Sequence, residues 1–325
     1  MRTSVQRIAA AVLALLSGVA AFPLSGFAFA FPEERYAQSL VPATGGSSVP
    51  GSPSDNTVGS KPGERTLMWR NTAVIGGIAA GVAAYGANSW WKGGLSGSFS
   101  TQSEGWFGQD TYAGGADKIG HAFFTYLGTR LLARGFEAIG NEPDRSLRLA
   151  AWTSFGVLLG VEIVDGFSES FHFSMEDVVA NAAGVAFALL VEKYPRVDAL
   201  LDFRLLYQRS EDAKRLGEND PLQDYSGQTY LLAFKADGVP RLRDVPLVRY
   251  IELQVGYGTR GYEPNDGQVD PHRRVYYGVG VNLSRLLSDT VFRGDLKGGK
   301  IQGVTDTVLE FLQIPGTTAL TYTRL

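Results

Sequence analysis

Residues 114–195 read GGADKIGHAFFTYLGTRLLARGFEAIGNEPDRSLRLAAWTSFGVLLGVEIVDGFSESFHFSMEDVVANAAGVAFALLVEKYP, and this stretch decides the fold. Residues 149–161 and 178–191 carry no charge, so helices formed there would be apolar nearly all round and buried. The spacing predicts helices over residues 115–139, 145–165 and 175–194, with Ser174 as the N-cap of the last.

Polar side chains recur within this stretch three or four positions apart, so each group lies on one helix face. The pairs are Asp117 with His121, Glu162 with Asp165, and Asp177 with Asn181, and Lys118 directly follows Asp117. A buried charge costs several kcal/mol or more unless a partner or a proton compensates it. We therefore predict that these side chains face one another in a shared interior, where Lys118 neutralises Asp117 or a neighbouring carboxylate.

Composition narrows the classes of partner. The chain has 325 residues, a net charge of −3, a sequence pI near 5.7 and no cysteine. A general nucleic-acid binder needs a basic face, so nucleic acid is excluded as a partner and membrane or envelope components are expected. Because the chain has no cysteine, thiolate catalysis, Cys-based zinc sites and a lipid-modified Cys are excluded. A protein, a lipid or a small molecule remains open as a partner, and the sequence does not identify a protein partner.

The N-terminal residues have the pattern of an export signal. Arg2 and Arg7 precede an apolar run that ends in Ala28-Phe29-Ala30, which predicts a signal peptide over residues 1–30. An uncleaved anchor is the alternative. Residues 31–67 are rich in Pro, Gly and Ser and are expected to form a disordered linker. The protein is thus expected to be exported, either to the periplasm or to a membrane of the bacterial envelope.

Residues 71–91 carry no charge and are long enough to span a bilayer, but Gly and Ala dominate them. Small residues also suit close helix packing, so a membrane segment and a bundle helix both remain open. Trp90 and Trp91 fit either an interfacial belt or aromatic packing at a helix end. With this segment, residues 68–207 are expected to form a bundle of about four helices.

After a charged linker, residues 208–325 are rich in β-forming sequence. The runs TYLLAFKA, VRYIELQVGYGTRGY, RRVYYGVGVNLSRLL, TVLEFLQI and ALTYTRL predict four or five antiparallel strands. Within the second run, Ile251, Leu253 and Val255 share one side of the strand, and Glu252 and Gln254 share the other. Closed membrane barrels need at least about eight strands, so we expect a small sheet that packs on the bundle, in an α+β protein.

The blocks ADKIGH, GVEIVDGFS and FSMEDVVANAAG together resemble the YfiM-like family of periplasmic proteins of unknown function, and more remotely the VanZ-like membrane proteins. The resemblance covers roughly a quarter of the chain. It implies an envelope-associated helical bundle and no defined activity. Some enteric members look like lipoproteins, and this sequence departs from them because it has no cysteine.

Two hypotheses for the polar residues stay open. In the first, His121, Glu162 and Asp177 are catalytic in a membrane-interface hydrolase, through a divalent metal or acid–base chemistry, with Asp117, Lys118, Asp165 and Asn181 in binding roles. No H-E-x-x-H or G-x-S-x-G motif supports it. In the second, a satisfied buried network serves a structural or binding role and no cofactor is needed. His172 is expected to pack in a loop and His272 to be solvated.

Overall fold

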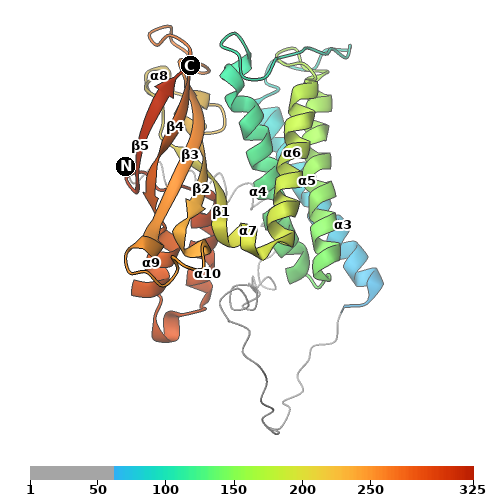
Figure 1. The fold of residues 1–325 in the computed structure, drawn as a ribbon. Helices are drawn as coiled ribbons and strands as arrows, with labels where there is room; N and C mark the ends of the chain where they lie inside the picture. The colour runs from blue at the N-terminus through green and yellow to red at the C-terminus, as the bar shows by residue number, and fades with distance from the viewer. Residues whose placement is uncertain (1–61) are drawn as a thin grey trace.

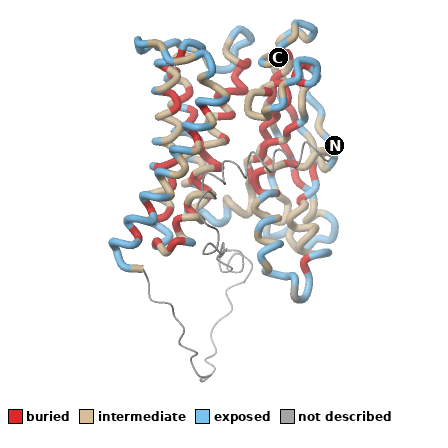
Figure 2. The backbone as a smooth tube through the Cα atoms, turned by 180° about the vertical axis from the view of Figure 1, so that it is seen from behind, coloured by how far each residue is buried: buried red, intermediate tan, exposed pale blue. Residues whose placement is uncertain are grey.

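The computed structural model describes residues 62–325, so the predicted signal peptide and most of the predicted linker lie outside the described residues. The described chain forms two halves, a helical bundle followed by an antiparallel sheet with short helices (Figure 1). This arrangement confirms the predicted α+β fold class. Exposed residues gather mainly in the loops at the two ends, and buried residues run along the helices and strands between them (Figure 2).

Four long helices form the bundle. The ends of the last three agree with the predicted ones to within two residues, whereas the first begins seven residues before the predicted segment 71–91. They are α3 (Glu64–Ser89), α4 (Ala116–Ala138), α5 (Pro143–Asp165) and α6 (Met175–Lys193). Pro143 starts α5 at a position where its missing N–H costs nothing. Ser174 caps α6, because its hydroxyl accepts a hydrogen bond from the backbone N–H of Asp177. A short 3-10 turn, η2 (Tyr112–Gly115), leads into α4.

Helices α4 and α6 cross at a glycine. A Cβ placed on Gly184 would lie 2.0 Å from the carbonyl oxygen of Ala122 and 2.1 Å from Oγ1 of Thr125. Any larger residue at this position would force the two helices apart. The close approach holds the start of α6 beside the start of α4, where the polar residues lie.

The sheet contains five antiparallel strands in the order β1-β2-β3-β4-β5. They are β1 (Leu201–Tyr207), β2 (Gln228–Lys235), β3 (Ile251–Arg260), β4 (His272–Val281) and β5 (Thr318–Arg324). Shorter elements connect them: α7 (Pro195–Leu200), α8 (Glu211–Leu216), η3 (Tyr225–Gly227), η4 (Ala236–Gly238), η5 (Val248–Tyr250), α9 (Leu283–Thr290), η6 (Gly294–Leu296) and α10 (Lys300–Phe311).

Three segments differ from the expected element type. Residues 201–207 were expected to extend the bundle as an amphipathic segment, but they form the edge strand β1. The run TVLEFLQI was expected as a strand, and most of it forms the end of α10, since short apolar runs do not distinguish strand from helix. The run that holds β4 also changes type, because Asn282 caps α9 after the strand.

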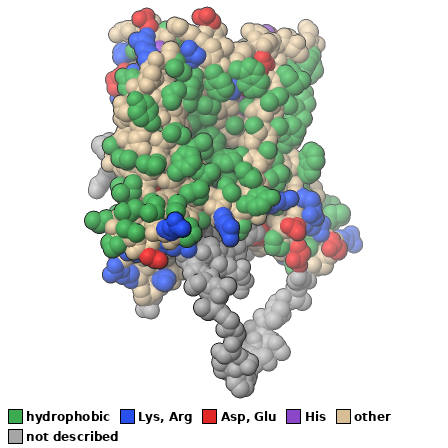
Figure 3. Space-filling view, viewed as in Figure 1, with side chains coloured by type: hydrophobic (Ala, Val, Ile, Leu, Met, Phe, Trp, Pro, Cys, Tyr) green, Lys and Arg blue, Asp and Glu red, His purple; other side chains and the backbone are tan. Residues whose placement is uncertain are grey.

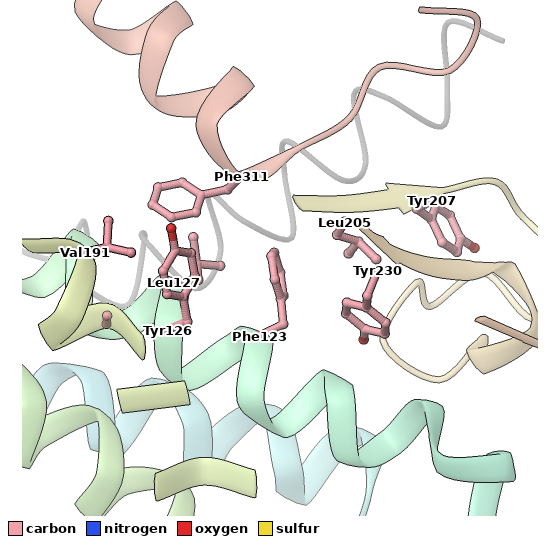
Figure 4. Close-up of a cluster of buried hydrophobic side chains, with 9 residues drawn as sticks. Phe123, Tyr126, Leu127, Val191, Leu205, Tyr207, Tyr230 and Phe311 are labelled. Atoms are coloured by element: carbon pink, nitrogen blue, oxygen red, sulfur yellow. The ribbon is translucent and has the colours of Figure 1, made fainter. Parts of the chain in front are cut away.

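The main hydrophobic core lies between the bundle and the first two strands (Figure 4). Phe123 and Tyr126 of α4 meet Phe203 of β1 with ring centroids 5.2 and 5.6 Å apart, and Tyr230 of β2 lies 5.6 Å from Phe123. Phe311 at the end of α10 contacts Tyr126 from the other side. These aromatic contacts join the two halves.

A buried cation reinforces this junction. Arg130 of α4 is 2% exposed, and its guanidinium lies 2.8 Å from Glu192 and 2.6 Å from Asp198, on α6 and α7. It also pairs at 2.5 Å with Glu310 of α10. Charge-assisted hydrogen bonds to three different elements fix their relative positions more firmly than apolar contacts alone.

The bundle covers only part of the apolar face of the sheet. Glu252 and Gln254 of β3 are 0% and 1% exposed, whereas Leu253 and Val255 on the opposite side are 61% and 44% exposed. Val255 pairs with Leu232, which pairs with Phe203, so it lies on the sheet face that meets the bundle. The bundle packs on that face at β1 and β2 and leaves it uncovered at β3. Arg204 of β1 crosses the buried side to reach Glu252 at 2.7 Å.

Candidate functional site

The predicted polar residues meet at one end of the bundle. Helix α4 begins there, α5 ends there and α6 begins there, because α4 runs antiparallel to α5 and the chain turns back after Asp165. The residues Asp117, Lys118, Glu162, Asp177 and Asn181 are all at most 6% exposed. The buried acidic and histidine cluster that the helical spacing predicts is thus present. We call these five residues, with His121, the polar cluster.

Lys118 is the internal cation of the polar cluster. Its Nζ lies 3.0 Å from Oδ2 of Asp117 and 2.8 Å from Oδ1 of Asp177, so it bridges the starts of α4 and α6. A third carboxylate, Glu104, also contacts Nζ. One ammonium group therefore serves three carboxylates, and the predicted neutralisation of Asp117 by Lys118 is observed.

His121 lies at the centre of the polar cluster. Its Nδ1 is 3.2 Å from Oδ1 of Asn181 and 3.6 Å from Oε1 of Glu162. Its Nε2 is 3.7 Å from Oδ1 of Asp117 and 3.9 Å from Oδ1 of Asp177. The ring thus links all three helices. The amide nitrogen of Asn181 is buried and has no hydrogen-bond partner within residues 62–325.

Two contacts come from residues that the helical pattern could not reveal. Tyr225, from η3 in the sheet half, donates its hydroxyl to Oδ1 of Asp117 at 2.9 Å. Glu104 belongs to the Gly- and Ser-rich loop before α4, where a single acidic residue gave no periodic signal. A long-range contact such as that of Tyr225 leaves no trace in local sequence.

Asp165 lies beside the polar cluster and has a partner of its own. It accepts a hydrogen bond from Nε1 of Trp91 at 2.6 Å. The ring of Trp91 also packs against Gly86, and Trp90 packs edge-on against Tyr85 with centroids 4.7 Å apart. Of the two expectations for these tryptophans, aromatic packing at the end of α3 is the one observed.

The remaining histidines lie apart from the polar cluster. His172 sits in the loop before α6, and its Nδ1 lies 2.8 Å from Oγ of Ser100. His272 begins β4 and is 7% exposed, so the expectation that it is solvated is wrong. Its Nδ1 donates to the carbonyl of Asp270, and Arg274 donates to its Nε2.

Burial shifts the protonation of the polar cluster. Burial raises the pKa of Glu162 to about 8 and that of Glu104 to about 7. Burial alone would lower the pKa of His121, but the carboxylates of Asp117, Asp177 and Glu162 outweigh it and raise that pKa to about 9. At neutral pH, His121 is therefore a cation and Glu162 is mostly a neutral acid.

Three ligand atoms of the polar cluster are close enough to hold a metal ion. One atom each from Asp117, His121 and Asp177 lie within 4.8 Å of one another. A histidine nitrogen and two carboxylate oxygens suit a divalent cation such as Zn²⁺ or Mn²⁺. A metal would have to displace the proton of His121 and compete with the ammonium of Lys118, so these residues fit a metal only with that cost.

A mostly apolar cavity of about 270 Å³ opens from the polar cluster. One face of each of three helices lines it, at the spacing of three and four residues that defines a helix face. Its lining includes Val74, Ile78 and Val82 of α3, Phe124, Leu131 and Gly135 of α4, and Val157, Leu158 and Val161 of α5. Asp117, His121, Glu162 and Asp177 line its polar end.

The fold is that of an α+β protein, and the comparison with known families places it among exported, envelope-associated proteins. The model of the family described as "Predicted periplasmic lipoprotein (DUF2279)" matches residues 103–193. The matched segment contains Glu104 and the whole polar cluster, and it leaves out α3 and the sheet. The match does not name the YfiM-like or VanZ-like families, so that finer resemblance stays a prediction.

No curated protein and no solved structure matches the chain.

Proposed function

We propose that this protein binds an amphipathic molecule, with the apolar chain of the ligand in the cavity between α3, α4 and α5 and its head group at the polar cluster. The observation that carries the proposal is the cavity itself, which is apolar along the helices and ends at buried ionisable groups. Ligand sites in proteins combine an apolar lining with a few convergent polar groups. The closest description is a non-catalytic envelope binding protein.

The charges of the polar end indicate which head group fits. Asp117, Asp165 and Asp177, with Glu104 and Glu162, supply five carboxyl groups around the two cations Lys118 and His121. Even with Glu162 neutral, the acidic groups are in excess. A cationic head group, or a neutral one rich in hydroxyls, therefore fits better than a phosphate or carboxylate.

A binding experiment with probes of different charge tests this selectivity. The purified protein, held in an amphipathic polymer, is titrated by calorimetry with dodecyltrimethylammonium, dodecyl glucoside and dodecyl phosphate, each below its micelle concentration. We expect the cationic and neutral probes to bind at least tenfold more tightly than the anionic one. Equal affinity for all three would contradict a head-group site at the polar cluster.

A second experiment tests the position of the acyl chain. Gly135 lines the cavity and has open space where a Cβ would lie, so Gly135→Leu fills the cavity without a backbone clash. It lies 14 residues beyond His121, a rise of about 21 Å along α4. We expect Gly135→Leu to lower the affinity for hexadecyltrimethylammonium at least tenfold. The affinity for the octyl homologue should change by less than twofold.

The matched control is Gly156→Leu on α5, where the glycine is exposed and a Cβ also meets nothing. Both variants replace a helical glycine by the same residue and gain the same helix propensity. Loss of hexadecyl binding in both, or in neither, would contradict a chain site between the helices.

Hydrolysis is the second candidate function, and the close approach of Asp117, His121 and Asp177 favours it. Its difficulty is that a histidine with a pKa near 9 is protonated at neutral pH and cannot act as a general base. Metal analysis of the purified protein tests the metal-dependent version. Stoichiometric metal in the wild type and none in His121→Ala would favour it, and equal metal content in both would remove it.

A further inference from the structure

The outward sides of the bundle helices carry large apolar side chains that no described element covers. Trp152 and Ile163 of α5 are 75% and 44% exposed, and Val179 and Leu190 of α6 are 47% and 43% exposed. Residues 149–161 and 178–191 contain no charge, so these faces have no polar side chains to hold water strongly. Exposed apolar surface of this extent marks an interaction site.

The apolar face of the sheet has the same character where it extends beyond the bundle, at β3 and β4. Leu253 pairs with Val279, and Val255 pairs with Tyr277, in the register of β3 and β4. All four side chains are between 44% and 61% exposed. An antiparallel sheet in water turns its polar side outward, whereas strands in a lipid bilayer turn the apolar side outward. The opposite, polar side of β3 is buried, and Glu252 on that side is held by Arg204.

The apolar surfaces of the two halves form one band. Figure 3 shows hydrophobic side chains across the face shared by the sheet and the helices, with Lys, Arg, Asp and Glu gathered mainly along the two edges. The uncharged residues 149–161 of α5 rise about 20 Å, and residues 71–91, most of which belong to α3, rise about 30 Å as a helix. A bilayer presents about 25 to 30 Å of hydrocarbon to such a band.

Aromatic residues lie where the band ends. Trp69 at the start of α3 and Tyr194 at the end of α6 are 62% and 57% exposed, and each adjoins a basic residue at one edge. Trp106, near the opposite edge, is 45% exposed. Tryptophan and tyrosine prefer the boundary between hydrocarbon and head groups, so exposed aromatics at both edges fit a bilayer better than a protein partner.

We propose that both halves of this protein are seated in a phospholipid bilayer, with the outward faces of α5, α6, β3 and β4 in contact with acyl chains. Among the helices of residues 62–325, length and composition alone single out α5 as able to cross a membrane. The exposed apolar side chains of β3 and β4 are a second, independent observation in favour of contact with lipid. The polar cluster lies at the polar edge of the band, beyond the uncharged runs.

Single-cysteine spin labelling tests the proposal cleanly, because the chain has no cysteine of its own. The full chain is reconstituted in phosphatidylcholine vesicles with a nitroxide at Leu253→Cys, Val279→Cys or Val179→Cys. Relaxation by oxygen, which concentrates in hydrocarbon, is compared with relaxation by a water-soluble nickel chelate. Gln268→Cys and Lys297→Cys, in exposed polar loops, are the controls.

We expect the ratio of oxygen to nickel accessibility to be at least tenfold higher at the three band positions than at the two loop positions. High nickel accessibility at Leu253→Cys and Val279→Cys would overturn the proposal for the sheet. Labels that neither reagent reaches would show a covering protein surface instead, and dipolar broadening between labels would identify that surface as a second copy of this chain. Both of these results overturn contact with lipid.

Discussion

Two buried polar networks lie in the two halves of this protein, and they are built on opposite principles. In the sheet, Asp202 and Glu252 are matched by Arg204 and Lys235, so two anions meet two cations. At the end of the bundle, carboxyl groups outnumber the cations, and burial raises the pKa of Glu162 to about 8. The charges of the sheet network balance one another, so this network can be closed to solvent. The polar cluster has an excess of carboxyl groups, so it can still take up a proton, a cation or a ligand.

Protonation follows the same division. Burial would raise the pKa of Asp202, but Lys235 and Arg204 outweigh it and hold that pKa below its usual value. The polar cluster is divided. Burial would raise the pKa of Asp117, but His121 and Lys118 outweigh it and lower that pKa, whereas burial and the charge of Asp117 raise the pKa of Asp177. The cations of the polar cluster therefore satisfy only some of its acids. We therefore assign a stabilising role to the sheet network and a binding role to the polar cluster.

The largest effect is expected from breaking the balanced network. Arg204→Met leaves Asp202 and Glu252 buried without their shared cation, and removing one partner of a buried ion pair costs about 3–5 kcal/mol. We expect the free energy of unfolding to fall by that amount, as measured by urea denaturation of the detergent-purified protein. Arg241→Met, at an exposed position, is the control and should change it by less than about 0.5 kcal/mol.

The polar cluster should make stability depend on pH. His121 and Glu162 both bind protons more tightly in the folded protein than in the unfolded chain, so both lose stabilisation as pH rises. For His121 the contribution is complete below pH 6.5 and is lost as pH rises through about 9. For Glu162 the loss falls between pH 4.5 and about 8.

We expect the free energy of unfolding to decrease by at least about 3 kcal/mol between pH 5 and pH 9, since one unit of pKa shift corresponds to about 1.4 kcal/mol and the shift of His121 alone would supply that much. Glu162→Gln should flatten the lower part of the profile and His121→Gln the upper part. Denaturation series at several pH values measure both. A wild-type profile that is flat, or rises, over this range would contradict the assigned protonation states.

Substitution of Lys118, the internal cation of the polar cluster, compares this cluster with the sheet network more directly. Lys118→Met removes the ammonium that competes for Asp117 and Asp177, so we expect affinity for Mn²⁺ or Zn²⁺ to rise at least tenfold. Calorimetric titration with the metal alone measures it. Lys235→Met removes the matching lysine of the sheet network and should bring no such gain. Equal gains in both variants would erase the distinction between the two networks.

The smallest effect is expected at Glu104, which lies at the edge of the polar cluster with 14% of its side chain exposed. Its pKa is raised to about 7, so it is about half ionised at neutral pH. Glu104→Gln should therefore change the free energy of unfolding by less than about 1 kcal/mol at pH 7. Thermal or urea unfolding measures this change. A loss of several kcal/mol would show that Glu104 stabilises the protein as strongly as the members of the polar cluster.

The sequence predicted the helices and their meeting point because both rest on local periodicity. Asp117, His121, Glu162 and Asp177 could be recognised because they are ionisable residues next to apolar helical sequence, which leaves their side chains few solvent-exposed positions. The contribution of Tyr225 was not predictable, since it depends on how η3 of the sheet half meets α4. The alternation of β3 gave its two faces correctly. It could not show that the bundle stops at β2 and leaves the apolar side chains of β3 exposed, because that depends on long-range packing.

The glycine crossing of α4 and α6 has a mechanical consequence for ligand entry. With Gly184 in contact with the backbone of Ala122, these two helices cannot slide or separate without breaking their tightest contact. Helix α3 is different: it buries only Leu67, Asn71, Val82 and Gly86. Of the three helices that line the cavity, α3 therefore buries the fewest residues, and we expect it to yield more easily than α4 when a ligand enters.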